Sequence, residues 1–342
     1  MTTRENHVTT ERSAPLPRTV CVAGASGLVG SHIVKACLAK GWTVRGSMRD
    51  PVDPAKAPYL EALPGADERL RLFDAEMCNE GSFDAAVEGA DCVFIACLIP
   101  TYHGPSGKPA GEMDDEQGYA EIIMPTVNGC LNILRSAVRH GVKNVVICSS
   151  TSSTNPVPCP AVKNEVDHWS DEAEQCRAGK YTSATKTVME RAAFQFAGQH
   201  HLRMSVFLPS MIVGPVVLPS QVHDGLRKLV RGEMWHERIP NNSMSIIDVR
   251  DLAGLHVAAS ENAEACGRYF GVYDSWHWVD IYAALQEILP DMTMPAPPDG
   301  DLVAATGFDH RRKQSLGVPL RDIPSILRES IEWIRSDPFP DG

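Results

Sequence analysis

Three polar residues have the side chains that carbonyl reduction by hydride transfer requires. Such a reaction needs an acid that protonates the forming alkoxide and a donor that polarises the carbonyl group. A tyrosine beside a lysine serves as the acid, because the ammonium lowers the phenol pKa from about 10 towards neutrality, and a serine hydroxyl serves as the donor. The chain offers Ser150, Tyr181 and Lys186 in this order. Each also has a structural interpretation, as a strand-end serine, a tyrosine at a helix start and a solvated lysine.

A glycine-rich turn near the amino terminus indicates a bound dinucleotide. An apolar run begins at residue 19, glycines follow at positions 24, 27 and 30, and a helical pattern continues until Gly41. This layout predicts a strand that enters a helix through a tight turn, where backbone N–H groups and the helix dipole favour a diphosphate. The spacing G-x-x-G-x-x-G also suits a turn without a ligand, which is the alternative interpretation.

The end of the second predicted strand indicates which cofactor the turn holds. About 20 positions after the glycines, a dinucleotide fold places a residue beside the adenosine ribose, and an acidic side chain there favours NAD. Here that strand ends at Arg49, and Lys56 follows, so a 2′-phosphate would meet a guanidinium fork and a point charge. We therefore expect NADP(H), with NAD(H) as the alternative because Asp50 can partly neutralise Arg49.

Short apolar runs alternate with helical patterns over the first 210 residues. This alternation predicts an α/β fold, a Rossmann-type doubly wound parallel sheet with helices on both faces. The predicted strands cover residues 19–23, 42–48, 70–73, 92–97, 145–148 and 204–208, and the two longest predicted helices cover 122–140 and 183–197. A loop over 101–117 follows the fourth strand, and we expect it at the carboxyl edge of the sheet, where ligands bind.

The regular alternation ends after the sixth strand, which predicts a smaller second lobe. We expect a disordered tail over residues 1–17 and a Rossmann dinucleotide-binding domain over 18–210. Residues 211–340 would mainly form an interwoven, C-terminal substrate-binding lobe, with the segment 245–258 returning to the Rossmann domain.

The composition argues against several kinds of partner. The chain has 342 residues, and 43 acidic against 32 basic side chains give a net charge of −11, which disfavours nucleic acid and anionic membranes. No apolar run reaches the roughly 20 residues of a membrane-spanning helix. The cysteines form no C-x-x-C pair and the histidines no metal-binding spacing, so we expect no metal and a cytoplasmic protein. A small-molecule substrate and a monomer or homodimer are the remaining expectations.

The ordered set of motifs resembles the extended short-chain dehydrogenases/reductases. The similarity is to the branch of dihydroflavonol reductases, cinnamoyl-CoA reductases and related aldehyde and ketone reductases, and it covers residues 18 to about 336. The matching segments are 20–27, 49–51, 80–84, 93–94, 148–150, 169–171, 186–187, 209–210, 213–215, 248–249 and 267–269.

The resemblance implies a role for individual residues. Ser150, Tyr181 and Lys186 would be catalytic, and Glu76 stands where the family usually has aspartate. The implied cofactor-binding residues are Gly24, Ser26, Gly27, Leu28, Val29, Gly30, Arg49, Lys56, Glu76, Met77, Ala96, Cys97, Pro209 and Ser210.

Four residues are candidates for the substrate pocket: Ile99, Tyr102, Asn155 and Ile212. Asn155 lies five residues after Ser150, where dihydroflavonol reductases place an asparagine that touches the substrate, although Asn-Pro is also a common turn opener. The coenzyme A thioester reductases of this branch carry an aromatic-rich stretch around the tyrosine that is absent here. We therefore expect a free ketone or aldehyde, aromatic or medium-sized.

One departure from the family pattern concerns the tyrosine and the lysine. The family spacing is Tyr-x-x-x-Lys, but here four residues separate Tyr181 from Lys186, and Thr182 falls in the tyrosine position. In a regular helix five residues turn about 500°, which directs Tyr181 about 140° away from Lys186. A π-bulge or a tyrosine placed before the helix would restore the pair, or the activity could be absent. Because an aliphatic hydroxyl is a weak acid, we predict Tyr181 as the acid.

These observations lead to one main functional hypothesis and two alternatives. The main hypothesis is NADPH-dependent reduction of a carbonyl to an alcohol. An alcohol dehydrogenase or a sugar-nucleotide epimerase or dehydratase on the same scaffold is the first alternative. A non-catalytic NADP-binding regulator is the second, because the spacing of Tyr181 and Lys186 is disturbed.

Overall fold

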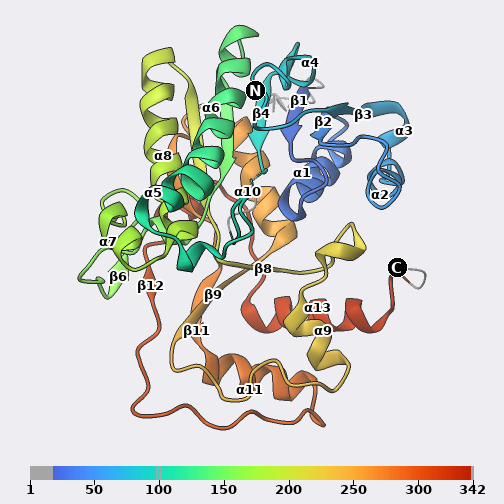
Figure 1. Ribbon diagram of the computed structural model, residues 1–342. Helices are drawn as coiled ribbons and strands as arrows, with labels where there is room; N and C mark the ends of the chain where they lie inside the picture. Colours follow the sequence, from blue (N-terminus) through green and yellow to red (C-terminus); the bar gives the residue numbers. More distant parts are fainter. Residues whose placement is uncertain (1–17, 98, 100–101, 340–342) are drawn as a thin grey trace, which may run out of the picture.

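A seven-stranded parallel sheet forms the centre of the molecule (Figure 1). The computed structural model describes residues 18–97, 99 and 102–339, so the predicted tail over 1–17 lies outside the described residues. The strand order is β10-β7-β5-β4-β1-β2-β3, which confirms the predicted α/β class. The strands are β1 (Thr19–Ala23), β2 (Thr43–Met48), β3 (Leu70–Asp74), β4 (Cys92–Ile95), β5 (Asn144–Cys148), β7 (Arg203–Leu208) and β10 (Gly267–Phe270).

Helices cover both faces of this sheet. On one face α1 (Leu28–Ala39) packs beside α10 (Val249–Glu261), and on the other α6 (Met124–Arg139) packs beside α8 (Tyr181–His200). Successive residues of β1 alternate between the two cores: Val20 lies in the α1 and α10 core, and the next residue lies in the α6 and α8 core. Side chains of a strand point alternately to the two faces, so a strand buried on both faces is a continuous apolar run.

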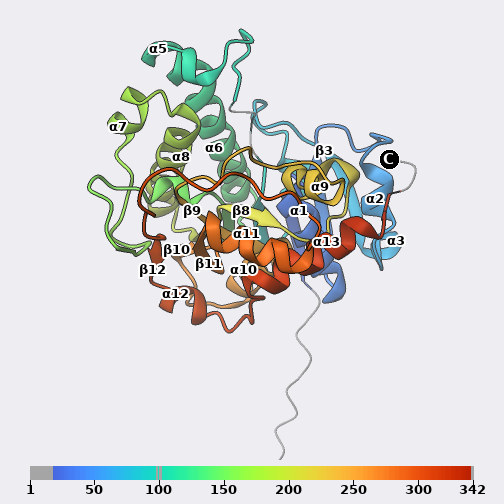
Figure 2. The ribbon, with the colours of Figure 1, turned by 90° about the horizontal axis from the view of Figure 1, so that it is seen from below.

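A smaller lobe is built on a three-stranded sheet of β11 (Asp274–His277), β9 (Ser243–Asp248) and β8 (Met211–Val213). Its core is apolar and contains side chains from α9 (Asp224–Val230), α11 (Trp278–Ile288) and α13 (Ile323–Arg335). This lobe lies below the central sheet in Figure 1, and Figure 2 looks at it from below.

The chain passes between the two parts more than once after residue 210. Strand β9 belongs to the small sheet, whereas α10 packs on α1 and β10 joins the central sheet. The domain boundaries proposed from the sequence, 18–210 and 211–340 with 245–258 returning, stay a prediction.

Short elements complete the described chain. The predicted loop over 101–117 contains helical turns, and a π-helical turn, η2, precedes α6. Further pairing joins β12 to β6. The short elements are α2 (Ala57–Glu61), α3 (Ala66–Arg69), α4 (Asp84–Val87), η1 (Ala110–Glu112), α5 (Asp115–Gly118), η2 (Tyr119–Ile123), η3 (Thr151–Ser153), β6 (Val162–Lys163), α7 (Glu172–Arg177), η4 (Pro219–Gln221), β12 (Gly307–Phe308) and α12 (Arg311–Gln314). None of the described helices is both long and apolar enough to cross a bilayer.

Candidate active site

The glycine-rich turn between β1 and α1 is closely packed against neighbouring backbone. Gly24 has a φ of +85°, and its N–H donates to the carbonyl of Ser47 at 3.0 Å. A Cβ atom on Gly30 would lie 2.0 Å from the carbonyl oxygen of Gly24, so no larger residue fits there. Gly27 precedes α1 and provides no side-chain cap, which leaves the first N–H groups of this helix available to an anion.

A cavity of about 640 Å³ lies beside this turn, at the carboxyl ends of β1, β2, β3 and β4. Of the predicted cofactor residues, its lining includes Gly24, Ser26, Gly27, Arg49, Lys56, Glu76, Met77, Ala96 and Cys97. The sequence analysis did not identify a second group of lining residues, Ser47, Met48, Asp50, Ala75, Cys78 and Phe83. Most of these residues end or follow a strand of the sheet. Their position at a strand end is the sequence feature that could have identified them as lining residues.

The cavity has two cations at the end of β2. Arg49 is exposed and makes no hydrogen bond or ion pair with any described residue, whereas Lys56 forms an ion pair with Asp53 at 2.7 Å. Arg45 is excluded as an anion ligand because its guanidinium donates to two backbone carbonyls of α4 and lies over the ring of Phe73. The carboxylate of Asp50 accepts the N–H of Val52 at 3.0 Å, within its own turn. Arg49 is therefore available to bind a phosphate.

Ser150 and Lys186 lie at the carboxyl end of β5. Ser150 follows this strand, and its hydroxyl oxygen accepts the N–H of Ser152 at 3.2 Å. Lys186 is 7% exposed, and its ammonium has no hydrogen-bond partner within the described ranges. Burial lowers the pKa of this ammonium, while Cys148 and Glu190 act in the opposite direction. A buried ammonium without a partner is costly, so the position suits a ligand that brings hydroxyl groups.

Tyr181 lies away from Lys186 in this structure. It is the first residue of α8, which is α-helical from Tyr181 onward, so no π-bulge lies between the two residues. Its hydroxyl donates to a carboxylate oxygen of Asp115 at 2.6 Å, and its ring packs on Gly118, where a Cβ atom would lie 2.5 Å from the ring. The hydrogen bond to Asp115 raises the pKa of Tyr181 to about 12, which makes the phenol a weaker acid.

Thr182 occupies the face of α8 that carries Lys186. Residues four apart on a regular helix are neighbours on one face, whereas residues five apart diverge by about 140°. Thr182 is half-buried and Lys186 buried, so this face points into the protein. The predicted role of Tyr181 as the acid stays untested, but the described geometry gives it no support.

The predicted substrate residues do not form one surface. Ile99 lines the cavity, Tyr102 is 75% exposed, and Ile212 packs against the core beneath α1 and α10. The amide oxygen of Asn155 accepts a hydrogen bond from the ammonium of Lys163. The sequence analysis missed Lys163, and since it lies eight residues further on, across a proline-rich turn, no local spacing indicated it.

The remaining predicted cofactor residues lie next to this region. Leu28, Val29 and Gly30 form the first turn of α1. Pro209 follows β7, and its carbonyl accepts the N–H of Thr151 at 2.9 Å. The hydroxyl of Ser210 lies 3.8 Å from the sulfur of Met244.

Replacing Gly24 by alanine should lower the free energy of unfolding by about 2–5 kcal/mol. About 1–2 kcal/mol comes from the positive φ, and overpacking adds about 1–3 kcal/mol because the new Cβ would lie 2.6 Å from the Cβ of Cys97. Gly41→Ala is the matched control, since Gly41 has a φ of +75° with open space around it and should lose only the first contribution. Urea unfolding measures both variants. If both variants lose the same free energy of unfolding, the close approach of Cys97 to Gly24 does not contribute to stability.

The sequence is similar to one protein family and to curated reductases. Residues 20–271 match the model of the NAD dependent epimerase/dehydratase family. The chain is 31% identical over 335 residues to a cinnamoyl-CoA reductase of Medicago truncatula, which covers 96% of this chain and 98% of that protein. It is 33% identical over 284 residues to a dihydroflavonol 4-reductase of Dianthus caryophyllus, which covers 81% of this chain and 75% of the relative.

Solved structures show the same fold. Vestitone reductase from alfalfa superimposes with a TM-score of 0.74 at 24% identity, over 94% of this chain and 99% of that one. The yeast methylglyoxal/isovaleraldehyde reductase Gre2, solved with NADPH, has a TM-score of 0.74 at 20% identity, over 93% and 98% of the two chains. The extent of the family match and of the curated relatives confirms the resemblance inferred from the motifs. The chain belongs to the NAD dependent epimerase/dehydratase family, among the extended short-chain dehydrogenases/reductases.

Proposed function

We propose that this protein is an NADP(H)-dependent oxidoreductase that reduces the carbonyl group of a small molecule to an alcohol. The observation that carries the proposal is a cavity beside the glycine turn together with a buried ammonium at Lys186 that has no hydrogen-bond partner among the described residues. The family and the curated relatives, which are reductases, support the same chemistry. The relative named for dihydroflavonol, an aromatic ketone, supports an aromatic or medium-sized ketone or aldehyde as the substrate class.

The residues of the cavity fit NADP(H). The glycine turn and the first turn of α1 would bind the diphosphate, and Arg49 with Lys56 would bind the 2′-phosphate. The ammonium of Lys186 would donate to ribose hydroxyl groups, which gives it the partners that the described residues do not provide. When bound, the cofactor supplies the hydride.

The reaction also needs a donor that polarises the carbonyl group and a source of the proton. Ser150 is the candidate for the first role, and Tyr181 and Thr182 are the candidates for the second. The Ser150 hydroxyl would donate to the carbonyl oxygen and stabilise the charge that develops there. The hydroxyl of Tyr181 is hydrogen-bonded to Asp115, and Thr182 lies on the face of α8 that carries Lys186. We propose that Thr182 relays a proton: its hydroxyl donates to the alkoxide while accepting a proton from the Lys186 ammonium. Burial lowers the pKa of Lys186, which makes this ammonium a better proton source than an exposed lysine.

The relay predicts that Thr182→Val lowers kcat by about 10- to 100-fold in carbonyl reduction. Valine keeps the shape of threonine and removes the hydroxyl. Tyr181→Phe should leave kcat within about 3-fold and cost about 1 kcal/mol of stability through the lost hydrogen bond to Asp115. NADPH consumption with a panel of ketones and aldehydes measures these rates. Thr182→Tyr, which restores the family spacing, should retain turnover.

Two results would contradict parts of this account. A Tyr181→Phe variant that loses turnover while Thr182→Val keeps it would make Tyr181 the acid. NADPH binding by calorimetry without reduction of any carbonyl in the panel would favour the non-catalytic regulator.

Arg49→Leu should weaken NADPH binding about 10- to 100-fold and leave NADH binding nearly unchanged. The reason is the loss of charge-assisted hydrogen bonds to the 2′-phosphate, which contribute roughly 1.5–3 kcal/mol. Arg71→Leu is the control, because Arg71 is an exposed arginine over Phe73 that does not line the cavity. Fluorescence titration gives the Kd of each cofactor. An equal loss for NADPH and NADH would place the 2′-phosphate elsewhere.

A further inference from the structure

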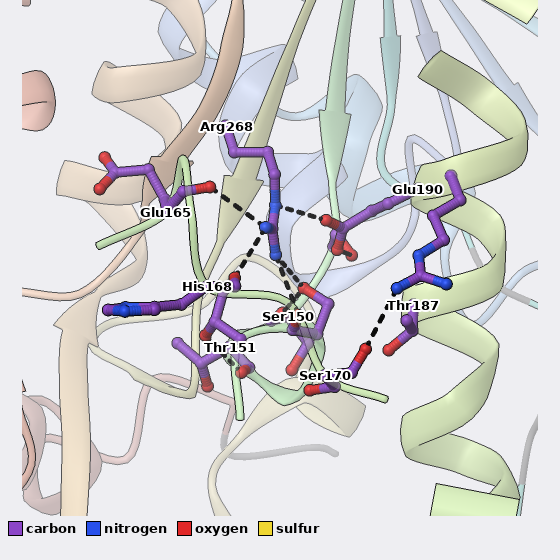
Figure 3. A network of polar contacts seen from close by, with 12 residues as sticks. Ser150, Thr151, Glu165, His168, Ser170, Thr187, Glu190 and Arg268 are labelled. Carbon is purple, nitrogen blue, oxygen red and sulfur yellow. Dashed lines mark hydrogen bonds and ion pairs between the residues drawn. The ribbon is translucent and has the colours of Figure 1, made fainter. Parts of the chain in front are cut away.

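Arg268 is a buried arginine in the edge strand β10, and its side chain is 3% exposed. The residue pairs with Val206 of β7 in the central sheet. Figure 3 shows its guanidinium between Glu190 on α8 and the loops that carry Ser150 and His168. The side chain therefore lies next to the loop that carries Ser150, the serine of the candidate site.

The guanidinium of Arg268 binds two separate segments of backbone. One terminal nitrogen donates to the carbonyls of Glu165 at 3.1 Å and His168 at 3.0 Å. The other donates to the carbonyl of Ser153 at 3.1 Å and to its hydroxyl at 2.9 Å. The Cζ atom of this group lies 3.6 Å from the centroid of the Trp169 ring. One side chain thus holds the turn after β5 and the loop before α7 together.

The same guanidinium is anchored to α8 by a buried carboxylate. The Nε atom of Arg268 lies 2.9 Å from Oε2 of Glu190, which is fully buried and one helical turn after Lys186. The other carboxylate oxygen of Glu190 accepts the hydroxyl of Ser149, next to Ser150. Glu190 thus connects α8 to strand β10 and to the residue that follows β5.

Further hydrogen bonds connect the residues that Arg268 contacts to Ser150 and Asn155. The N–H and the hydroxyl of Ser153 both donate to the carbonyl of Ser150, at 3.2 Å and 2.9 Å. The hydroxyl of Ser170 donates to the carbonyl of Ser152 at 2.7 Å, and it accepts the N–H of Asn155 at 2.8 Å. The segments 150–155 and 165–170 therefore form one unit, with Arg268 beneath it.

We propose that Arg268 is a positioning residue that fixes the Ser150 hydroxyl and the Asn155 segment for carbonyl reduction. The part of this inference that concerns catalysis rests on the proposed function. Arg268 acts through the backbone of 150–170 and does not touch the reacting atoms.

Arg203 provides a matched control within the same sheet. It also collects backbone carbonyls, those of Ala259, Ser260, Asn262 and Ala265, at 2.7–3.1 Å. Arg203 begins β7, so these contacts lie at the amino end of the strand, opposite the candidate site. A variant there removes a comparable set of hydrogen bonds without altering the segment 150–170.

Arg268→Met should lower kcat at least 10-fold and change the Kd of NADPH less than 2-fold. Arg203→Met leaves no buried carboxylate unpaired, so it should destabilise the protein less, and it should keep kcat within 2-fold. Arg268→Lys should recover part of the lost kcat, because an ammonium keeps the charge but not the fork that reaches both segments. If Arg268→Met does not fold, Ser153→Ala removes the hydroxyl that contacts Arg268, Ser150 and Glu190, and it should lower kcat about 3- to 10-fold.

Hydrogen exchange of peptides covering 149–170 tests the inference without turnover. Arg268→Met and Ser153→Ala should speed exchange in this segment, whereas Arg203→Met should not. Unchanged exchange and unchanged kcat in both site variants would overturn the positioning role. If the wild-type protein reduces no carbonyl, the proposed function fails, and the exchange result still decides whether Arg268 holds the segment.

Discussion

The ammonium of Lys186 is a positive charge enclosed by protein, without a hydrogen-bond partner in the described part of the chain. Such a group is costly, and a nearby anion lowers that cost. Glu190 provides the anion, one turn further along α8. Lys186 lies near Cys97, which lines the cavity, so the lysine is close to the cofactor region.

The same helix shows why the site departs from its family pattern. One extra residue between Tyr181 and Lys186 could be absorbed by a bulge, but α8 stays regular and Tyr181 turns to Asp115 instead. The π-helical turn occurs in η2, directly after Gly118, on which the tyrosine ring packs. Tyr181 thereby anchors the segment before α6, and the face of α8 beside Lys186 carries a threonine.

The sequence predicted the central sheet well because each inner strand is buried on both faces and reads as an apolar run. It did not predict β10 as a strand, because Arg268 interrupts the apolar pattern and its compensating carboxylate comes from Glu190, distant in sequence. The position of Tyr181 was equally inaccessible, since it depends on Asp115, 66 residues earlier. By contrast, the sequence could place the glycine turn and Arg49 beside the cavity because their signal is local: a spacing and a strand end.

The measurement that tests the account most directly is a crystal structure of the complex with NADPH. The account predicts that the Lys186 ammonium lies within about 3.2 Å of ribose hydroxyls. It also predicts that the Thr182 hydroxyl lies on the same side and that the Tyr181 hydroxyl stays on Asp115. A Tyr181 hydroxyl within hydrogen-bond distance of the Lys186 ammonium, or a ribose that does not reach this lysine, would contradict it.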